Sequence, residues 1–107
     1  MDSLEKLEKI INERKNVKSE GSYTCYLFEK GIDKILKKCG EECSEMIIAA
    51  KNAKKEEIVL ETSDLIYHIM VMLAQMDIPL SEIDKELESR AKKQMNLKEM
   101  KNTDLNS

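Results

Sequence analysis

The sequence is poor in aromatic and turn-forming residues. Its 107 residues include no Trp, one Phe, three Tyr, three Gly and one Pro. Because strands favour aromatic and β-branched side chains and hairpins need glycine, this composition argues against a β-sheet protein. The abundance of Lys, Glu, Leu, Ile and Met predicts an all-α fold instead, and the length predicts a single domain.

The charge balance excludes further classes of protein. Lys and Arg number 18 against 21 Asp and Glu, a net charge of −3. No basic stretch is interleaved with aromatic residues, so we expect no nucleic-acid partner. No apolar run approaches the roughly 20 residues that span a bilayer, and residues 1–15 are too charged for a signal peptide. Three cysteines, an odd number, predict reduced thiols, so we expect a cytoplasmic protein with no membrane partner.

Turn-forming and charged residues divide residues 1–95, the predicted domain, into four helices, and residues 96–107 are expected to be a frayed tail. The second helix contains two weak points, Gly31 and Gly40. The predicted helices span, in order, about 4–16, 24–52, 58–76 and 81–95. The side chains of the last helix that are expected to face inward are Leu80, Ile83 and Leu87.

The third predicted helix is too apolar for an ordinary surface helix. Between residues 58 and 76 its few polar side chains fall within one narrow stripe. Such a helix needs cover on most sides, which three short partner helices would not supply. We therefore expect a homodimer, in which a four-helix chain forms a dimeric helical bundle. The polar stripe consists of Glu57, Glu61, Asp64, His68 and Gln75.

Two pairs of carboxylates occur at the same spacing on successive predicted helices. Glu42 and Glu45 lie three residues apart, and Glu61 and Asp64 repeat this spacing. One helical turn presents both members of a pair, and antiparallel neighbours would bring the two pairs face to face. Four converging carboxylates repel one another unless a cation neutralises them, and oxygen ligands suit Mg²⁺ or Mn²⁺. Nearby lysines indicate that a polyphosphate completes the coordination.

Each of these residues also has a purely structural explanation. Adjacent glutamates such as Glu41 and Glu42 commonly form a solvated helix face, and a lone His68 is commonly a hydrogen-bonded core residue. Cys39, Cys43 and His68 offer ligands for zinc, but cysteines four residues apart on an apolar stripe normally serve packing.

Several motifs resemble those of the phosphoribosyl-ATP pyrophosphatase family, which belongs to the all-α nucleoside triphosphate pyrophosphatases. The pattern EExxE at 41–45 followed by ExxD at 61–64 is shared by the wider superfamily, whereas SYT at 22–24, the GEE context at 40–42 and DLxYH at 64–68 point to this family. The resemblance covers about residues 4–90, and the chain is expected to match the stand-alone form. The mild departures from the family pattern are Cys39, Cys43 and Ser63.

The resemblance implies an enzyme that hydrolyses phosphoribosyl-ATP to phosphoribosyl-AMP and pyrophosphate, the second step of histidine biosynthesis. It also implies a homodimer with sites at the subunit interface, bound Mg²⁺, and either Glu41 or Glu45 as the catalytic base. The implied metal ligands are Glu42, Glu45, Glu61 and Asp64. The implied substrate-binding residues are Lys34, Lys38, Lys51, Arg90, Tyr23, Thr24 and His68.

Two other functions are compatible with the same features. A housecleaning pyrophosphatase for non-canonical nucleotides would keep the carboxylates and differ in its base pocket. A non-enzymatic dimeric helical interaction module would instead pair its acidic stripe with the lysines of a partner. Pyrophosphate release from a panel of nucleotides distinguishes the two enzymes, and a Mg²⁺-dependent thermal shift distinguishes both from the interaction module.

Overall fold

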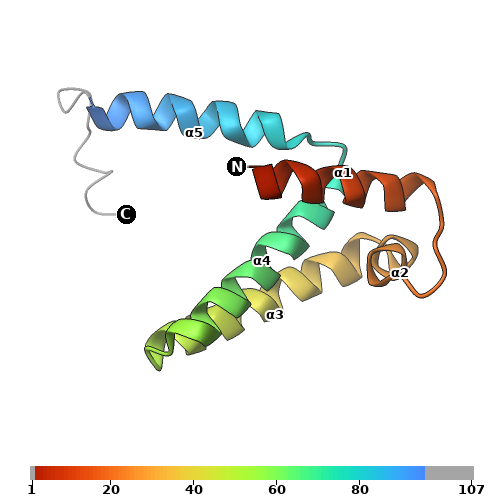
Figure 1. The fold of residues 1–107 in the computed structure, drawn as a ribbon, viewed down its shortest axis with the longest axis horizontal. Helices are drawn as coiled ribbons and strands as arrows, with labels where there is room; N and C mark the ends of the chain where they lie inside the picture. The colour runs from red at the N-terminus through yellow and green to blue at the C-terminus, as the bar shows by residue number, and fades with distance from the viewer. Residues whose placement is uncertain (1, 96–107) are drawn as a thin grey trace.

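The computed structural model describes residues 2–95, which form five α-helices and no strand (Figure 1). The predicted all-α fold is confirmed for these residues, and the frayed tail predicted for 96–107 lies outside them. No helix in this part of the chain is both long and apolar enough to cross a membrane. The helices are α1 (Asp2–Asn16), α2 (Tyr23–Lys30), α3 (Ile32–Lys51), α4 (Lys55–Gln75) and α5 (Leu80–Met95).

The predicted second helix is divided into α2 and α3 at Gly31, so the prediction of four helices is corrected to five for residues 2–95. Gly31 has φ 90° and ψ −175°, a backbone conformation that is essentially restricted to glycine. Its N–H donates to the carbonyl of Leu27 at 3.0 Å and its carbonyl accepts from Ile35 at 3.2 Å. The glycine therefore ends one helix and begins the next, whereas Gly40 lies inside α3.

Helices α3 and α4 form an antiparallel hairpin, and α1 crosses the C-terminal half of α4 (Figure 1). The hairpin turn is short, with Ala53 at a positive φ of 54°. Helix α2 fills the corner between α1, α3 and α4. The core lies where these four helices meet, and each contributes one fully buried aliphatic side chain, namely Ile11, Leu27, Ile35 and Val71.

Helix α1 holds the connection between α4 and α5. The Lys15 ammonium donates to the carbonyl of Ala74 at 2.7 Å and pairs with Asp77 at 2.6 Å. The Glu8 carboxylate accepts the backbone N–H of Leu80 at 2.7 Å. The Lys15 cation lies at the negative C-terminal end of α4, and the Glu8 anion lies at the positive N-terminal end of α5. Each charge is therefore opposite in sign to the partial charge of the helix terminus beside it.

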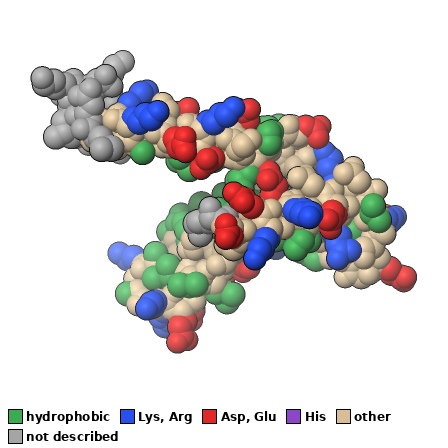
Figure 2. Space-filling view, turned by 45° about the horizontal axis from the view of Figure 1, so that its top comes forward, with side chains coloured by type: hydrophobic (Ala, Val, Ile, Leu, Met, Phe, Trp, Pro, Cys, Tyr) green, Lys and Arg blue, Asp and Glu red, His purple; other side chains and the backbone are tan. Residues whose placement is uncertain are grey.

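Helix α5 and the N-terminal half of α4 remain largely uncovered. Val59 and Leu60 are each 59% exposed. The prediction that Ile83 and Leu87 face inward does not hold within a single chain, because both side chains are exposed. Figure 2 shows apolar side chains at the surface of the α3–α4 hairpin, at the lower left of the view.

Replacing Gly31 with Ala is expected to lower the free energy of unfolding by about 1–3 kcal/mol, since alanine is strained in this conformation. The matched control is Gly40→Ala, because no atom lies within 4 Å of the added Cβ at that helical position. This control is expected to raise the free energy of unfolding by about 0.5–1 kcal/mol. Urea unfolding followed by circular dichroism, at one protein concentration, measures both. Equal stability of the two variants would contradict the role assigned to Gly31.

Candidate metal centre

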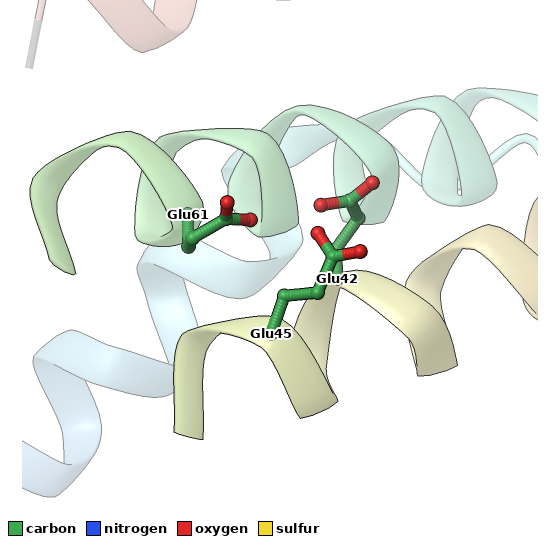
Figure 3. Close-up of side chains that lie close together, drawn as sticks. All are labelled: Glu42, Glu45 and Glu61. Carbon is green, nitrogen blue, oxygen red and sulfur yellow. The ribbon is translucent and has the colours of Figure 1, made fainter. Parts of the chain in front are cut away.

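Three carboxylates meet between α3 and α4 (Figure 3). Glu42 and Glu45 come from one turn of α3, and Glu61 comes from the facing turn of α4. One oxygen atom from each lies within 4.8 Å of the other two. Oxygen ligands about 2.1 Å from Mg²⁺ in an octahedron lie roughly 3–4 Å apart, so this carboxylate cluster has nearly the spacing that a cation requires.

Two oxygen atoms of the carboxylate cluster are buried without a hydrogen-bond partner in the described part of the chain. They are Oε2 of Glu42 and Oε2 of Glu61. Glu42 is only 7% exposed, and its other oxygen lies 3.4 Å from the Lys38 ammonium. Burying an unpaired carboxylate oxygen is costly. A divalent cation would satisfy both atoms, so these residues fit a metal ligand set.

The carboxylate cluster shifts the ionisation of Glu61. Protonated Glu61 shares a hydrogen bond with Glu45, and this bond, partial burial and the negative charges of Glu45, Glu42 and Asp64 raise the pKa of Glu61 to about 7. The metal-free cluster therefore takes up a proton more readily than a separate glutamate would. A cation competes with that proton for the same oxygen atoms.

The remaining predicted acidic residues lie at the edge of the carboxylate cluster. Asp64 follows Glu61 by one helical turn and its charge acts on Glu61, but it lies outside the group of three. Glu41 is exposed and lies 3.5 Å from the Lys38 ammonium. The Lys38 ammonium therefore contacts both the exposed carboxylate of Glu41 and the buried carboxylate of Glu42.

The predicted basic residues are placed very differently from one another. Lys34 is half-buried one turn before Lys38, and Lys51 is exposed at the end of α3. Arg90 lies on α5 and pairs with Glu86 at 3.1 Å. Helix α5 lies apart from the α3–α4 hairpin that carries the carboxylate cluster (Figure 1).

Tyr23 and His68 form a hydrogen bond that ties α2 to α4. Nδ1 of His68 lies 2.7 Å from the carbonyl of Asp64, which can only accept, so Nδ1 carries a proton. Nε2 accepts from the Tyr23 hydroxyl at 3.0 Å. Both ring nitrogens are thus engaged within the protein, as expected of a hydrogen-bonded core histidine, although the resemblance implies a substrate contact.

A zinc site built from Cys39, Cys43 and His68 finds no support in the geometry. Among the described residues, the only group of three or more potential ligands is the carboxylate cluster. Of the other predicted substrate-binding residues, Thr24 has its hydroxyl hydrogen bonded to the Tyr67 hydroxyl.

The sequence reasoning did not single out Tyr26 and Tyr67, although both belong to the aromatic cluster around Tyr23. The signal that could have found them is the scarcity of tyrosine. The chain has three tyrosines, and all of them lie within or beside the SYT and DLxYH motifs.

Comparison with known proteins agrees with the motifs. Residues 4–91 match the protein family described as phosphoribosyl-ATP pyrophosphohydrolase. The phosphoribosyl-ATP pyrophosphatase of Clostridium botulinum (strain Hall) is 54% identical over 100 residues, which cover 94% of this chain and 91% of the relative. The phosphoribosyl-ATP pyrophosphatase of Listeria innocua is 60% identical over 80 residues, or 75% of this chain and 77% of the relative.

A third relative is a larger protein. The histidine biosynthesis bifunctional protein HisIE of Caldanaerobacter subterraneus is 59% identical over 93 residues, which cover 87% of this chain and 45% of the relative. The family match includes the whole carboxylate cluster and the Tyr23–His68 pair. The resemblance drawn from the motifs is thus confirmed, and the chain belongs to the phosphoribosyl-ATP pyrophosphohydrolase family.

Proposed function

We propose that this protein hydrolyses phosphoribosyl-ATP at the α–β phosphoanhydride, giving phosphoribosyl-AMP and pyrophosphate in the second step of histidine biosynthesis. The observation that carries the proposal is the carboxylate cluster, in which two buried oxygen atoms lack partners. The names of its relatives supply the substrate. The three free cysteines are compatible with a cytoplasmic enzyme.

The residues that would hold Mg²⁺, or Mn²⁺ in its place, are Glu42, Glu45 and Glu61, with Asp64 as a fourth ligand. When bound, the cation neutralises negative charge on the triphosphate and withdraws electrons from phosphorus. Glu42 is best placed to be a fixed ligand, because burial and the Lys38 ion pair hold its side chain. Glu45 is exposed and has more freedom to move.

The protein's own contribution to the reaction is positioning and proton transfer. A water molecule attacks the phosphorus atom of the α-phosphate. The P–O bond that bridges to the β-phosphate breaks, and pyrophosphate leaves. The base that takes the proton from water is Glu45 or Glu41, both of which are exposed beside the site. Lys34, Lys38 and Lys51 line the same helix and offset the charge of the phosphates.

The proposal includes a homodimer. Apolar side chains of α3, α4 and α5 lie exposed on one chain, and their burial against a second copy would stabilise both. Such an interface would also allow Arg90 on α5 of one copy to approach the carboxylate cluster of the other copy. The exposed apolar side chains are Ile47, Ile48, Val59, Leu60, Ile66, Ile69, Ile83 and Leu87.

Glu61→Gln and Asp64→Asn are each expected to lower the rate of pyrophosphate release by about 100-fold or more, because they remove charge from the cation ligands. The measurement is pyrophosphate release from phosphoribosyl-ATP at saturating Mg²⁺, with circular dichroism to check the helices. The matched control is Glu57→Gln, one turn earlier on α4, where the exposed carboxylate pairs with Lys54 at 3.8 Å. Near-normal turnover of either site variant would refute the ligand assignment.

The same assay with a panel of nucleotides tests the substrate. Phosphoribosyl-ATP is expected to be hydrolysed well ahead of ATP and of non-canonical triphosphates such as ITP and dUTP. Preference for a non-canonical triphosphate would identify a housecleaning enzyme. Absence of both turnover and any Mg²⁺-dependent thermal shift would favour a non-enzymatic interaction module.

Binding of Mg²⁺ is expected to be about tenfold weaker at pH 6 than at pH 8. This factor follows from the pKa of about 7 for Glu61, because its proton must leave before the cation binds, and the protonated fraction falls as pH rises. Isothermal titration calorimetry at the two pH values measures the ratio. The weaker binding that remains in Glu61→Gln should vary much less with pH, and an unchanged dependence would assign the proton to another group.

A further inference from the structure

Three of the chain's four Phe and Tyr side chains gather at one place. All three tyrosines and the single histidine of the sequence take part. The ring centroid of Tyr23 lies 6.0 Å from that of Tyr26 and 6.2 Å from that of Tyr67, with interplanar angles of 23° and 28°. His68 meets Tyr23 edge-on at 5.8 Å. Tyr67 packs against the buried core, whereas Tyr23 and Tyr26 are exposed, so the need to fill the interior does not explain these two rings.

Two of these rings face solvent in a hollow. Tyr23 is 45% exposed and Tyr26 is 39% exposed. Both line a hollow of about 710 Å³ at the corner between α1 and α2, together with residues 18–22 of the connecting loop. This volume is in the range of small-molecule sites. Tyr23 and Tyr26 are the aromatic part of a lining that also includes the charged side chains of Lys18, Glu20 and Glu29.

The orientation of the Tyr23 ring is held from inside the protein. Its hydroxyl is hydrogen bonded to His68, which is only 5% exposed and is anchored in turn to the carbonyl of Asp64. The next residue, Thr24, is hydrogen bonded to Tyr67. The start of α2 is therefore fastened to α4 at two adjacent positions, and Tyr23 has little freedom to turn away from the hollow.

Tyr23 also lies close to the carboxylate cluster. Burial raises the pKa of its hydroxyl, the charge of Lys38 lowers it, and the charge of Glu42 raises it. The side chains that flank the metal centre thus lie within electrostatic range of this ring. Hydrogen bonds also link Tyr23 through His68 to the carbonyl of Asp64, the residue that follows Glu61 by one helical turn.

We infer that Tyr23 and Tyr26 form a stacking surface for the purine ring of the substrate, and that His68 is a positioning residue that fixes Tyr23. Every nucleobase presents a planar π-face, and aromatic side chains bind such faces by stacking. His68 acts through Tyr23, since neither of its nitrogens is available to a ligand. The inference rests on the proposed function for the identity of the base.

The test distinguishes recognition of the purine base from recognition of the phosphates. Tyr23→Ala and Tyr26→Ala are expected to raise the KM for phosphoribosyl-ATP by about 5- to 150-fold, the range measured when a stacking side chain is removed. The kcat should change much less. Inorganic tripolyphosphate, which has no base, should inhibit these variants as well as it inhibits the wild type. The matched control is Val17→Ala, an exposed apolar residue beside the same loop that does not line the hollow.

The positioning role of His68 needs its own variants. His68→Ala should raise KM in the same direction as Tyr23→Ala, whereas His68→Gln, which keeps an acceptor for the Tyr23 hydroxyl, should restore most of the wild-type KM. Tyr23→Phe keeps the ring and should fall between wild type and Tyr23→Ala. A purely structural role for His68 would instead lower the melting temperature and kcat without a selective change in KM.

Tyrosine fluorescence reports stacking directly, because the chain has no Trp. Addition of phosphoribosyl-ATP with Mg²⁺ to the wild type should quench the emission, and Tyr23→Ala should lose most of this change. The inference would be overturned if the KM for phosphoribosyl-ATP were unchanged in both tyrosine variants. It would also be overturned if inhibition by tripolyphosphate weakened as much as binding of phosphoribosyl-ATP. If the wild type released no pyrophosphate, the proposed function would fail, and the fluorescence titration would still decide whether the tyrosines bind the base.

Discussion

Repulsion among carboxylates is built into the packing of α3 against α4. The two helices are held together at one end by aliphatic contacts that include Ile35 and Val71, and their antiparallel course then brings Glu42, Glu45 and Glu61 together at the other end. The protein itself relieves little of this repulsion, through Lys38 and a proton on Glu61. Apolar packing thus holds the acids in a preformed arrangement whose remaining charge a divalent cation is suited to neutralise.

Helix α2 connects the core to the site. Leu27 lies fully buried in the core, whereas four residues earlier Tyr23 reaches His68 beside the carboxylate cluster. This placement depends on Gly31, because a continuous helix over residues 24–52 would carry Tyr23 away along the axis of α3. One glycine with an unusual backbone conformation therefore determines whether the aromatic cluster can form.

The sequence predicted that Glu42, Glu45 and Glu61 converge, because spacing within a helix and a short hairpin constrain geometry locally. Asp64, which the same spacing predicted, lies outside this group of three. Glu42 and Glu61 follow from that reasoning. It missed the break at Gly31, since glycine is tolerated within helices and its φ depends on tertiary contacts. The engagement of both His68 nitrogens and the gathering of the tyrosines depend on how α2 docks onto α4. Arg90 lies on α5, whose apolar side chains Ile83 and Leu87 are exposed within one chain.

Leu60 and Glu61 are neighbours on α4, one exposed on the apolar surface and the other in the carboxylate cluster. A rotation of α4 by about 20° would move a side-chain atom 6 Å from the helix axis by roughly 2 Å, several times the tolerance of a metal–ligand bond. In the proposed dimer, a substitution at Leu60 that altered the contact with the second copy would therefore also change the orientation of Glu61. The geometry of the metal centre would then depend on an aliphatic residue that is not itself a ligand.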